Sequence, residues 1–259
     1  MKTKYPIILV HGVMVKDFRF FKAFGRIEKV LKDNGYIVYT AKTDGLGTIE
    51  NNAQQLKDYI NHILETEKID KVNLIAHSKG GLDSKYYIEE LDETNNVASL
   101  TTLCTPYKGS PIASKILTMP KFIIFWVKTW FNIVYKIFGD KHPDGLKVCE
   151  QLKEVNNIEL ECLNINEDIY CQSYSSKMNH SKDDFIMSIP LAFSHYFNKN
   201  ETDGLVPVDS AKFANYKGNV MDESISHTEI VDFMVKKKKK EKIYNFYLKL
   251  CKDLVDLGF

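Results

Sequence analysis

Residues 72–81 read VNLIAHSKGG, and this stretch determines which fold the chain adopts. VNLIA is a mostly apolar run, which is typical of a strand buried on both faces. The residues that follow have helical spacing, so Ser78 lies on a strand-to-helix turn. Such a turn is tight and requires small residues two positions before and after the serine, as Ala76 and Gly80 are. Ser78 is therefore a candidate nucleophile, the alternative being a serine that only caps the helix.

The sequence on either side of this turn alternates between apolar runs and amphipathic segments. Strands are predicted at residues 5–10, 36–40, 72–76 and 97–103, and helices at 20–34, 48–66 and 81–91. Strands that alternate with helices at this spacing predict an α/β fold, with a mostly parallel sheet flanked by helices. Two later strands are expected at residues 169–173 and 219–221, and a last helix from about Thr228 into the C-terminal tail.

The composition is that of an ordinary globular protein. The 259 residues include 35 Lys plus Arg and 34 Asp plus Glu, for a formal net charge of +1. This balance argues against a nucleic-acid-binding protein, which carries a basic face and a high pI. Five cysteines without a CxxC pair indicate neither a disulfide framework nor a zinc site. The length allows one large domain or two small ones. Because a core with one inserted cap would use the whole length, a single domain over residues 1–259 is favoured.

Two stretches bear on membranes and compartment. The N-terminal MKTKYPIILVHG has an apolar run too short for a signal peptide, which predicts a cytoplasmic protein. The most apolar stretch, residues 116–138, is interrupted by Pro120 and three lysines. No transmembrane segment is therefore expected.

A serine nucleophile needs a base that takes its proton and an acid that orients the base. In folds with this turn, the acid and then the histidine follow the serine along the chain. His227 is the last histidine and the candidate base, whereas His195, beside aromatic residues, is interpreted as a partly buried structural histidine. Asp203, in a polar turn before Gly204, is the best candidate acid. Order alone leaves three other aspartates as alternatives: Asp184, Asp209 and Asp222.

Two backbone N–H groups must also face the oxygen of the tetrahedral intermediate. Lys79, the residue after Ser78, is expected to supply one of them. The loop HGVM after the first strand supplies the other, from Val13, because Gly12 lets the backbone approach closely. Only main-chain atoms are needed, so the side chains at these two positions are free to vary.

Five segments together carry a family resemblance: YPIILVHG, KVNLIAHSKGGLDSKYY, SLTTLCTPYKGS, TDGLVPVDSAKF and SHTEIVD. Over about residues 5–235 the chain resembles the bacterial true lipases of the α/β-hydrolase fold, typified by Pseudomonas and Burkholderia triacylglycerol lipases and their Bacillus relatives. The resemblance implies Ser78 as nucleophile, Asp203 as acid and His227 as base, and raises Asp203 above its alternatives. It also implies Val13 and Lys79 as oxyanion donors. Many members are secreted, which makes secretion the alternative location.

Members of that family often hold a structural calcium ion near the catalytic histidine. The resemblance places its carboxylate ligands at Glu229, two residues after His227, and at Asp183, twenty residues before Asp203. Carboxylates suit Ca²⁺, although the family usually has aspartate where this chain has Glu229. No cofactor is expected for the chemistry itself.

Residues 110–165 interrupt the alternation, at the place where this fold inserts a lid or cap. Seven of the chain's aromatic residues, including both tryptophans, fall within it: Phe122, Phe125, Trp126, Trp130, Phe131, Tyr135 and Phe138. An opposing stripe is polar: Lys121, Lys128, Asn132 and Lys136. The pattern predicts an amphipathic helix, interpreted as a lid that closes over Ser78 and makes transient contact with a lipid interface. The alternative is an ordinary core-packing helix.

The expected function is hydrolysis of carboxylic esters with apolar acyl chains, through a Ser-His-Asp triad and an acyl-enzyme. A triacylglycerol lipase acting on a lipid or ester substrate fits best. A short-chain carboxylesterase, a thioesterase and an acyltransferase on the same core are alternatives. A rival of another class is a non-catalytic membrane-surface protein that uses the five lysines at 236–240. The simpler interpretation of those lysines is a solvated helix face.

Overall fold

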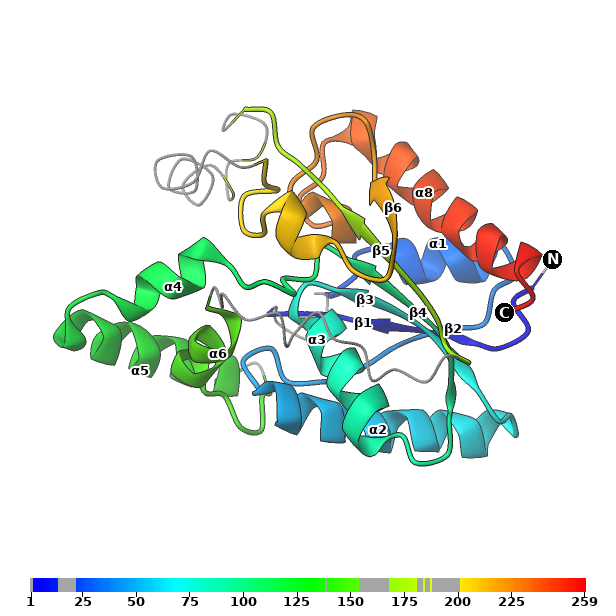
Figure 1. Cartoon of the computed structure of the whole chain (residues 1–259), viewed down its shortest axis with the longest axis horizontal. Coiled ribbons are helices and arrows are strands. Elements are labelled where there is room, and N and C mark those ends of the chain that lie inside the picture. The colour runs from blue at the N-terminus through cyan, green and yellow to red at the C-terminus, as the bar shows by residue number, and fades with distance from the viewer. Residues whose placement is uncertain are drawn as a thin grey trace.

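The computed structural model describes residues 2–13, 22–137, 139–153, 168–180, 184, 187 and 201–259, with residues 127 and 131 described by their backbone alone. Its centre is a six-stranded sheet of order β2-β1-β3-β4-β5-β6, in which all five strand pairings are parallel (Figure 1). The strands are β1 (Ile7–Val10), β2 (Val38–Thr40), β3 (Val72–His77), β4 (Val97–Leu103), β5 (Tyr170–Ser175) and β6 (Asn215–Asn219). The parallel sheet predicted from the sequence is confirmed.

Helices cover both faces of the sheet, and the alternation of side chains along β1 shows how. Ile7 and Leu9 pack into a cluster with residues of α1 (Ile27–Asp33) and α8 (Lys237–Asp256). Ile8 and Val10 pack into a second cluster with residues of α2 (Ile49–Glu67). Successive side chains of a strand point to opposite faces, so a strand buried on both faces must be apolar throughout.

The first helix, predicted over residues 20–34, is too long at its start. In the described residues α1 begins at Ile27, after Gly25 with a left-handed φ of 47°.

Two predicted boundaries nearer the C-terminus are also wrong, for identifiable reasons. The last helix does not start near Thr228, because the 3-10 turn Glu229–Val231 ends at Asp232, which has a left-handed φ of 60°. α8 begins only at Lys237. The last strand lies at β6 rather than at residues 219–221. β6 reads NYKGN at the edge of the sheet, so it has no apolar run that could have signalled it.

Three helices follow the carboxyl end of β4: α4 (Pro111–Leu117), α5 (Lys121–Ile137) and α6 (Gly145–Leu152). In Figure 1 they project from the body of the molecule, and we call residues 111–152 the helical lobe. This part of the predicted insertion is helical as expected, while residues 154–165 lie outside the described residues. In the described part of the chain, none of the helices combines the length and the hydropathy needed to span a membrane.

Candidate active site

Ser78 lies on the sharp turn between β3 and α3 (Lys79–Tyr86), with φ 55° and ψ −133°. This backbone conformation is strained for a residue with a side chain. The turn is held against β1, because a Cβ added to Gly80 would lie 2.6 Å from the carbonyl oxygens of Val10 and His11. The Ser78 side chain makes no capping hydrogen bond to α3, so the alternative of a simple helix cap is wrong.

His227 connects Ser78 to Asp203. Its Nε2 lies 2.9 Å from the Oγ of Ser78, and its Nδ1 lies 2.7 Å from Oδ2 of Asp203. A carboxylate can only accept, so Nδ1 donates to Asp203 and Nε2 is left to accept from the serine hydroxyl. The three residues come from positions 78, 203 and 227, and they meet beyond the carboxyl ends of the parallel strands.

Asp203 is fully buried and held on every side. Its Oδ1 accepts from the backbone N–H groups of Leu205 and Val206, at 3.0 and 2.8 Å. Its carbonyl oxygen accepts from the N–H of His227 at 3.0 Å, which fixes the histidine relative to the acid. Because Oδ1 is held by these two N–H groups, the carboxylate orients the imidazole through Oδ2.

None of the three alternative acids is hydrogen-bonded to His227 in the described residues. Asp184 accepts hydrogen bonds from the hydroxyls of Ser226 and Thr228. Asp209 is exposed and pairs with Lys212 at 2.6 Å. Asp222 lines a groove between α8 and the β5–β6 edge of the sheet. Among these candidates, geometry favours Asp203 as the acid.

Two further side chains, which the sequence did not indicate, lie behind Asp203. The Oγ of Ser176 is 3.4 Å from Oδ2 of Asp203 and 3.1 Å from the Sγ of Cys104. Burial, and then the negative charge of Asp203, raises the pKa of the Cys104 thiol well above its ordinary value of 9.0. The thiol therefore stays neutral and adds no competing charge beside the acid.

His77 packs against His227, with ring centroids 4.5 Å apart. Burial lowers the pKa of His77 well below its ordinary value of 6.5, and the neighbouring His227 lowers it further. His77 is therefore neutral at pH 7, so it does not repel an imidazolium that forms on His227.

The loop after β1 reaches the turn that carries the nucleophile. A Cβ added to Gly12 would lie 2.7 Å from Cβ of Ser78 and 2.8 Å from the backbone nitrogen of Lys79. Only a residue without a side chain permits this approach. Val13 follows directly and is partly exposed, so the two predicted oxyanion donors, Val13 and Lys79, belong to backbone segments in contact.

The side chain of Lys79 forms a buried ion pair that was not anticipated. Its Nζ lies 2.6 Å from Oδ1 of Asp83, and both side chains are fully buried. Asn52 of α2 donates to the other oxygen of Asp83 at 3.0 Å. Burial raises the pKa of Asp83 to about 6, although Lys79 acts in the opposite direction. The i, i+4 spacing of Lys79 and Asp83 on a helix was the sequence signal for this pair.

The expected calcium ligand Glu229 already has a cationic partner. Its Oε2 accepts from Lys239 Nζ at 2.7 Å and from the backbone N–H of Ser226 at 3.1 Å, and the carboxylate is buried. Asp183 and His195 lie outside the described residues. Over the described ranges, no three His, Cys, Asp or Glu side chains cluster around a common point. As arranged here, Glu229 does not fit a calcium site, because an ammonium group neutralises it.

Known proteins are similar to this chain in sequence. A triacylglycerol lipase of Saccharomyces cerevisiae is 28% identical over 258 residues, covering 90% of this chain and 73% of that protein. A triacylglycerol lipase of Burkholderia plantarii is 37% identical over 118 residues, or 43% of this chain. That match spans about a third of the bacterial enzyme's length. The resemblance to bacterial lipases is thereby confirmed.

The fold and the family follow from two further comparisons. The crystal structure of Staphylococcus hyicus lipase matches with a TM-score of 0.71 at 15% identity, over 97% of this chain and 95% of that one. This likeness confirms the predicted α/β-hydrolase fold. The model of the palmitoyl protein thioesterase family matches residues 6–244, and the chain therefore belongs to that family.

Proposed function

We propose that the chain is a serine hydrolase that cleaves carboxylic esters of apolar acyl chains, as a triacylglycerol lipase does. The observation that carries this proposal is the unbroken hydrogen-bonded series from Asp203 through His227 to Ser78. The similarity to triacylglycerol lipases of yeast and bacteria supports the same class of reaction.

The reaction begins when Ser78 Oγ attacks the ester carbonyl while His227 Nε2 takes the hydroxyl proton. Asp203 keeps the imidazole in the required tautomer and stabilises the imidazolium. The N–H groups of Val13 and Lys79 bind the oxygen that becomes negative. His227 then protonates the leaving alcohol, and water hydrolyses the acyl-enzyme by the same steps. Each step uses groups of the chain itself, so we propose no cofactor for the chemistry.

A thioester is the second candidate substrate class. The family model that matches the chain describes palmitoyl protein thioesterases. Thioester and ester hydrolysis proceed through the same acyl-enzyme, and a thiol leaving group needs less help from the protonated histidine. In either case we propose that the helical lobe contacts the lipid that holds the acyl chain.

The test is a substrate series measured with wild type and Ser78→Ala. Ser78→Ala should abolish turnover of p-nitrophenyl esters and labelling by a fluorophosphonate while the circular dichroism spectrum is unchanged. Ser114→Ala, in α4, serves as the control and should behave like wild type. Undiminished turnover in Ser78→Ala would refute the proposal.

The ester series, butyrate to palmitate, is run with and without an emulsion, beside palmitoyl-coenzyme A. Preference for long acyl esters in emulsion indicates a lipase. Preference for butyrate in solution indicates a short-chain carboxylesterase, and preference for the coenzyme A substrate indicates a thioesterase.

A further inference from the structure

Helix α5 presents an apolar stripe to solvent. Phe122, Trp126, Trp130, Ile133 and Ile137 are each between 55% and 71% exposed. At 3.6 residues per turn these five positions fall within an arc of about 80° on the helix. Among the α5 side chains that the structure describes, none is buried. An apolar patch of this kind on a soluble protein marks a site of contact with another phase or molecule.

The charge around the stripe is strongly positive. Residues 108–141 contain six lysines and a single acid, the buried Asp140, whereas the whole chain has a net charge of +1. The rest of the chain is therefore net negative. Lys121 and Lys136 of α5 are exposed, while Lys128 lies 3.5 Å from Asp144. Tryptophans beside lysines on one helix are the composition of helices that lie in the interface of anionic membranes.

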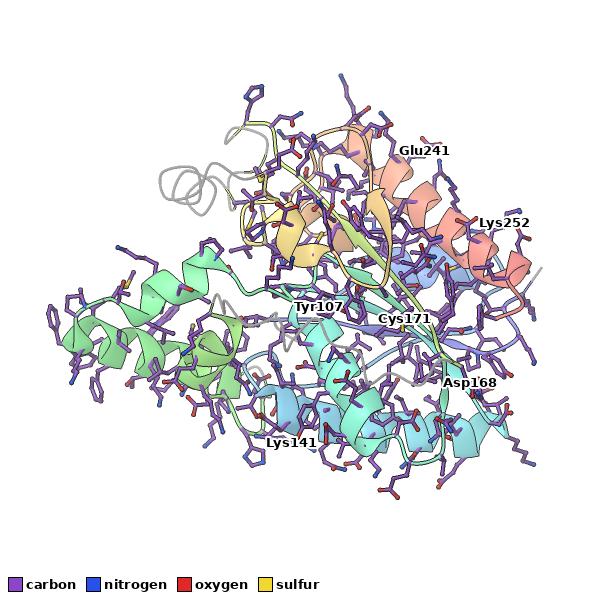
Figure 2. All side chains as sticks on the ribbon, in the orientation of Figure 1. Tyr107, Lys141, Asp168, Cys171, Glu241 and Lys252 are labelled. Carbon is purple, nitrogen blue, oxygen red and sulfur yellow. The ribbon has the colours of Figure 1, made fainter. Side chains whose placement is uncertain are left out.

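Two carboxylates connect the loop after α5 to the loop before α2, and each accepts hydrogen bonds from the backbone of the other loop. Asp140 accepts from the N–H groups of Gly45 and Leu46, at 3.0 and 2.8 Å. Asp44 accepts from the N–H groups of Lys141 and His142, both at 2.9 Å. Figure 2 shows Lys141 where the lobe meets the start of α2. These bonds fix the loop after α5 against the loop before α2.

Hydrogen bonds also connect Asp44 to α3, the helix that follows the nucleophile. Asn52 of α2 donates to the carbonyl oxygen of Asp44 at 2.8 Å and to Asp83 of α3 at 3.0 Å. A surface bound to α5 would thus stand in a fixed position relative to Ser78. The lobe follows β4 at the edge of the sheet where the catalytic groups lie (Figure 1).

We propose that the exposed face of α5, with Lys121 and Lys136, is a docking surface for an anionic phospholipid bilayer. It follows, resting on the proposed function, that the substrate is an acyl ester or thioester held in or on that bilayer. The positive charge of residues 108–141 is what selects the bilayer over a second copy of this chain, since two copies would repel one another along this face.

The test measures co-sedimentation of Ser78→Ala protein with vesicles, so that binding is separated from hydrolysis. Vesicles of phosphatidylcholine alone are compared with vesicles containing about one third phosphatidylserine. Wild-type α5 should favour the anionic vesicles and lose affinity at high salt, because surface charge is screened. Trp126→Ser/Trp130→Ser should lose most binding to them. Lys121→Glu/Lys136→Glu should lose about tenfold or more.

Matched controls alter exposed residues elsewhere. Met234→Ser/Leu257→Ser removes exposed apolar groups, and Lys237→Glu/Lys238→Glu makes the same charge change at the start of α8. Both should bind like the parent. The α5 substitutions are also made in the protein that keeps Ser78. These variants should hydrolyse soluble p-nitrophenyl butyrate as fast as wild type, which shows that they fold.

Three outcomes would overturn the proposal. These are unaltered vesicle binding by both α5 variants, absence of binding by the parent protein, and equal loss in the α8 control. A Trp126-dependent dimer without vesicle binding would also overturn it and assign the face to a second copy. The proposed function is tested separately, by turnover of p-nitrophenyl esters without lipid in wild type and Ser78→Ala. Failure of that test would leave the vesicle-binding result unaffected.

Discussion

The catalytic groups and the helical lobe both lie near the carboxyl ends of the strands. The catalytic side chains are buried, whereas the apolar side chains of the lobe are exposed. Asp203 and His227 are 0% and 5% exposed, and their polar atoms are hydrogen-bonded. Trp126 and Trp130 are 69% and 60% exposed, although they are large aromatic groups. Groups that must keep a precise geometry are buried in a satisfied network, whereas groups that meet another phase are left uncovered. The same substitution should therefore cost much at the first region and little at the second.

The largest contrast is expected for the acid of the triad. Asp203→Asn should lower kcat by about 10⁴. The amide oxygen would take the bonds from the N–H groups of Leu205 and Val206, so the amide NH2 would face Nδ1 of His227 as a donor and hold the imidazole in the wrong tautomer. Asp209→Asn makes the same change at an exposed aspartate and should leave kcat unaltered. Steady-state hydrolysis of p-nitrophenyl butyrate measures both. Equal rates for wild type and Asp203→Asn would mean that another carboxylate orients the base.

The next contrast compares two i, i+4 ion pairs. Lys79→Met removes the only cation paired with the buried Asp83 among the described contacts, and should cost about 3–5 kcal/mol of unfolding free energy at pH 7. Lys252→Met breaks the exposed pair with Asp256 on α8 and should leave the unfolding free energy almost unchanged, because water and salt screen that pair. Urea denaturation measures both, and Figure 2 shows Lys252 on the outer side of α8.

The cost of Lys79→Met should also depend on pH. Burial raises the pKa of Asp83 to about 6 in the folded protein, and loss of Lys79 would raise it further. Below pH 6 the folded state keeps the Asp83 proton in both proteins, so the difference in stability is constant. Above pH 6 the variant still holds a proton that its unfolded state has released, and its deficit grows. A deficit that shrinks between pH 6 and pH 8 would contradict this assignment.

A smaller contrast is expected for two glycines. Gly80→Ala puts a methyl group 2.6 Å from two backbone oxygens, and should cost about 1–3 kcal/mol of stability and reduce kcat. Gly145→Ala, at the start of α6 in the lobe, makes ordinary van der Waals contacts, with the side chain of Leu46 at 3.5 Å and Oδ1 of Asn132 at 3.6 Å. It should stabilise by about 0.5–1 kcal/mol, because alanine loses less backbone entropy in a helix. Thermal denaturation distinguishes them, and a neutral Gly80→Ala would show that the turn can relax.

The part of the site that sequence could predict is the part with a local signal. The strand, the tight turn and the helix around Ser78 are contiguous, so their spacing predicted both the fold and the nucleophile. Asp203 is different, because spacing left four aspartates and only the family resemblance selected one. The bonds that Leu205 and Val206 donate to it explain the choice in physical terms.

The rest depends on contacts between distant segments. No sequence pattern indicates that Ser176 and Cys104 lie together behind the acid. The reciprocal bonds of Asp44 and Asp140 join residues almost a hundred positions apart. They accept from backbone N–H groups, which every residue except proline offers, so no residue pattern records them. The aromatic stripe was visible in the sequence, but its exposure was not.

The smallest effect concerns metal. Because Lys239 already neutralises Glu229, removing divalent ions with a chelator should change the melting temperature by less than about 1 °C. Lys239→Met should instead cost about 1.5–3 kcal/mol, since a buried carboxylate loses a charged partner. The exposed Lys238→Met is the control and should have almost no effect. A marked fall in melting temperature with chelator, restored by Ca²⁺, would establish the calcium site that the family resemblance predicts. In that case Lys239 would have to leave Glu229 when the ion binds, and Lys239→Met should then bind Ca²⁺ more tightly than wild type.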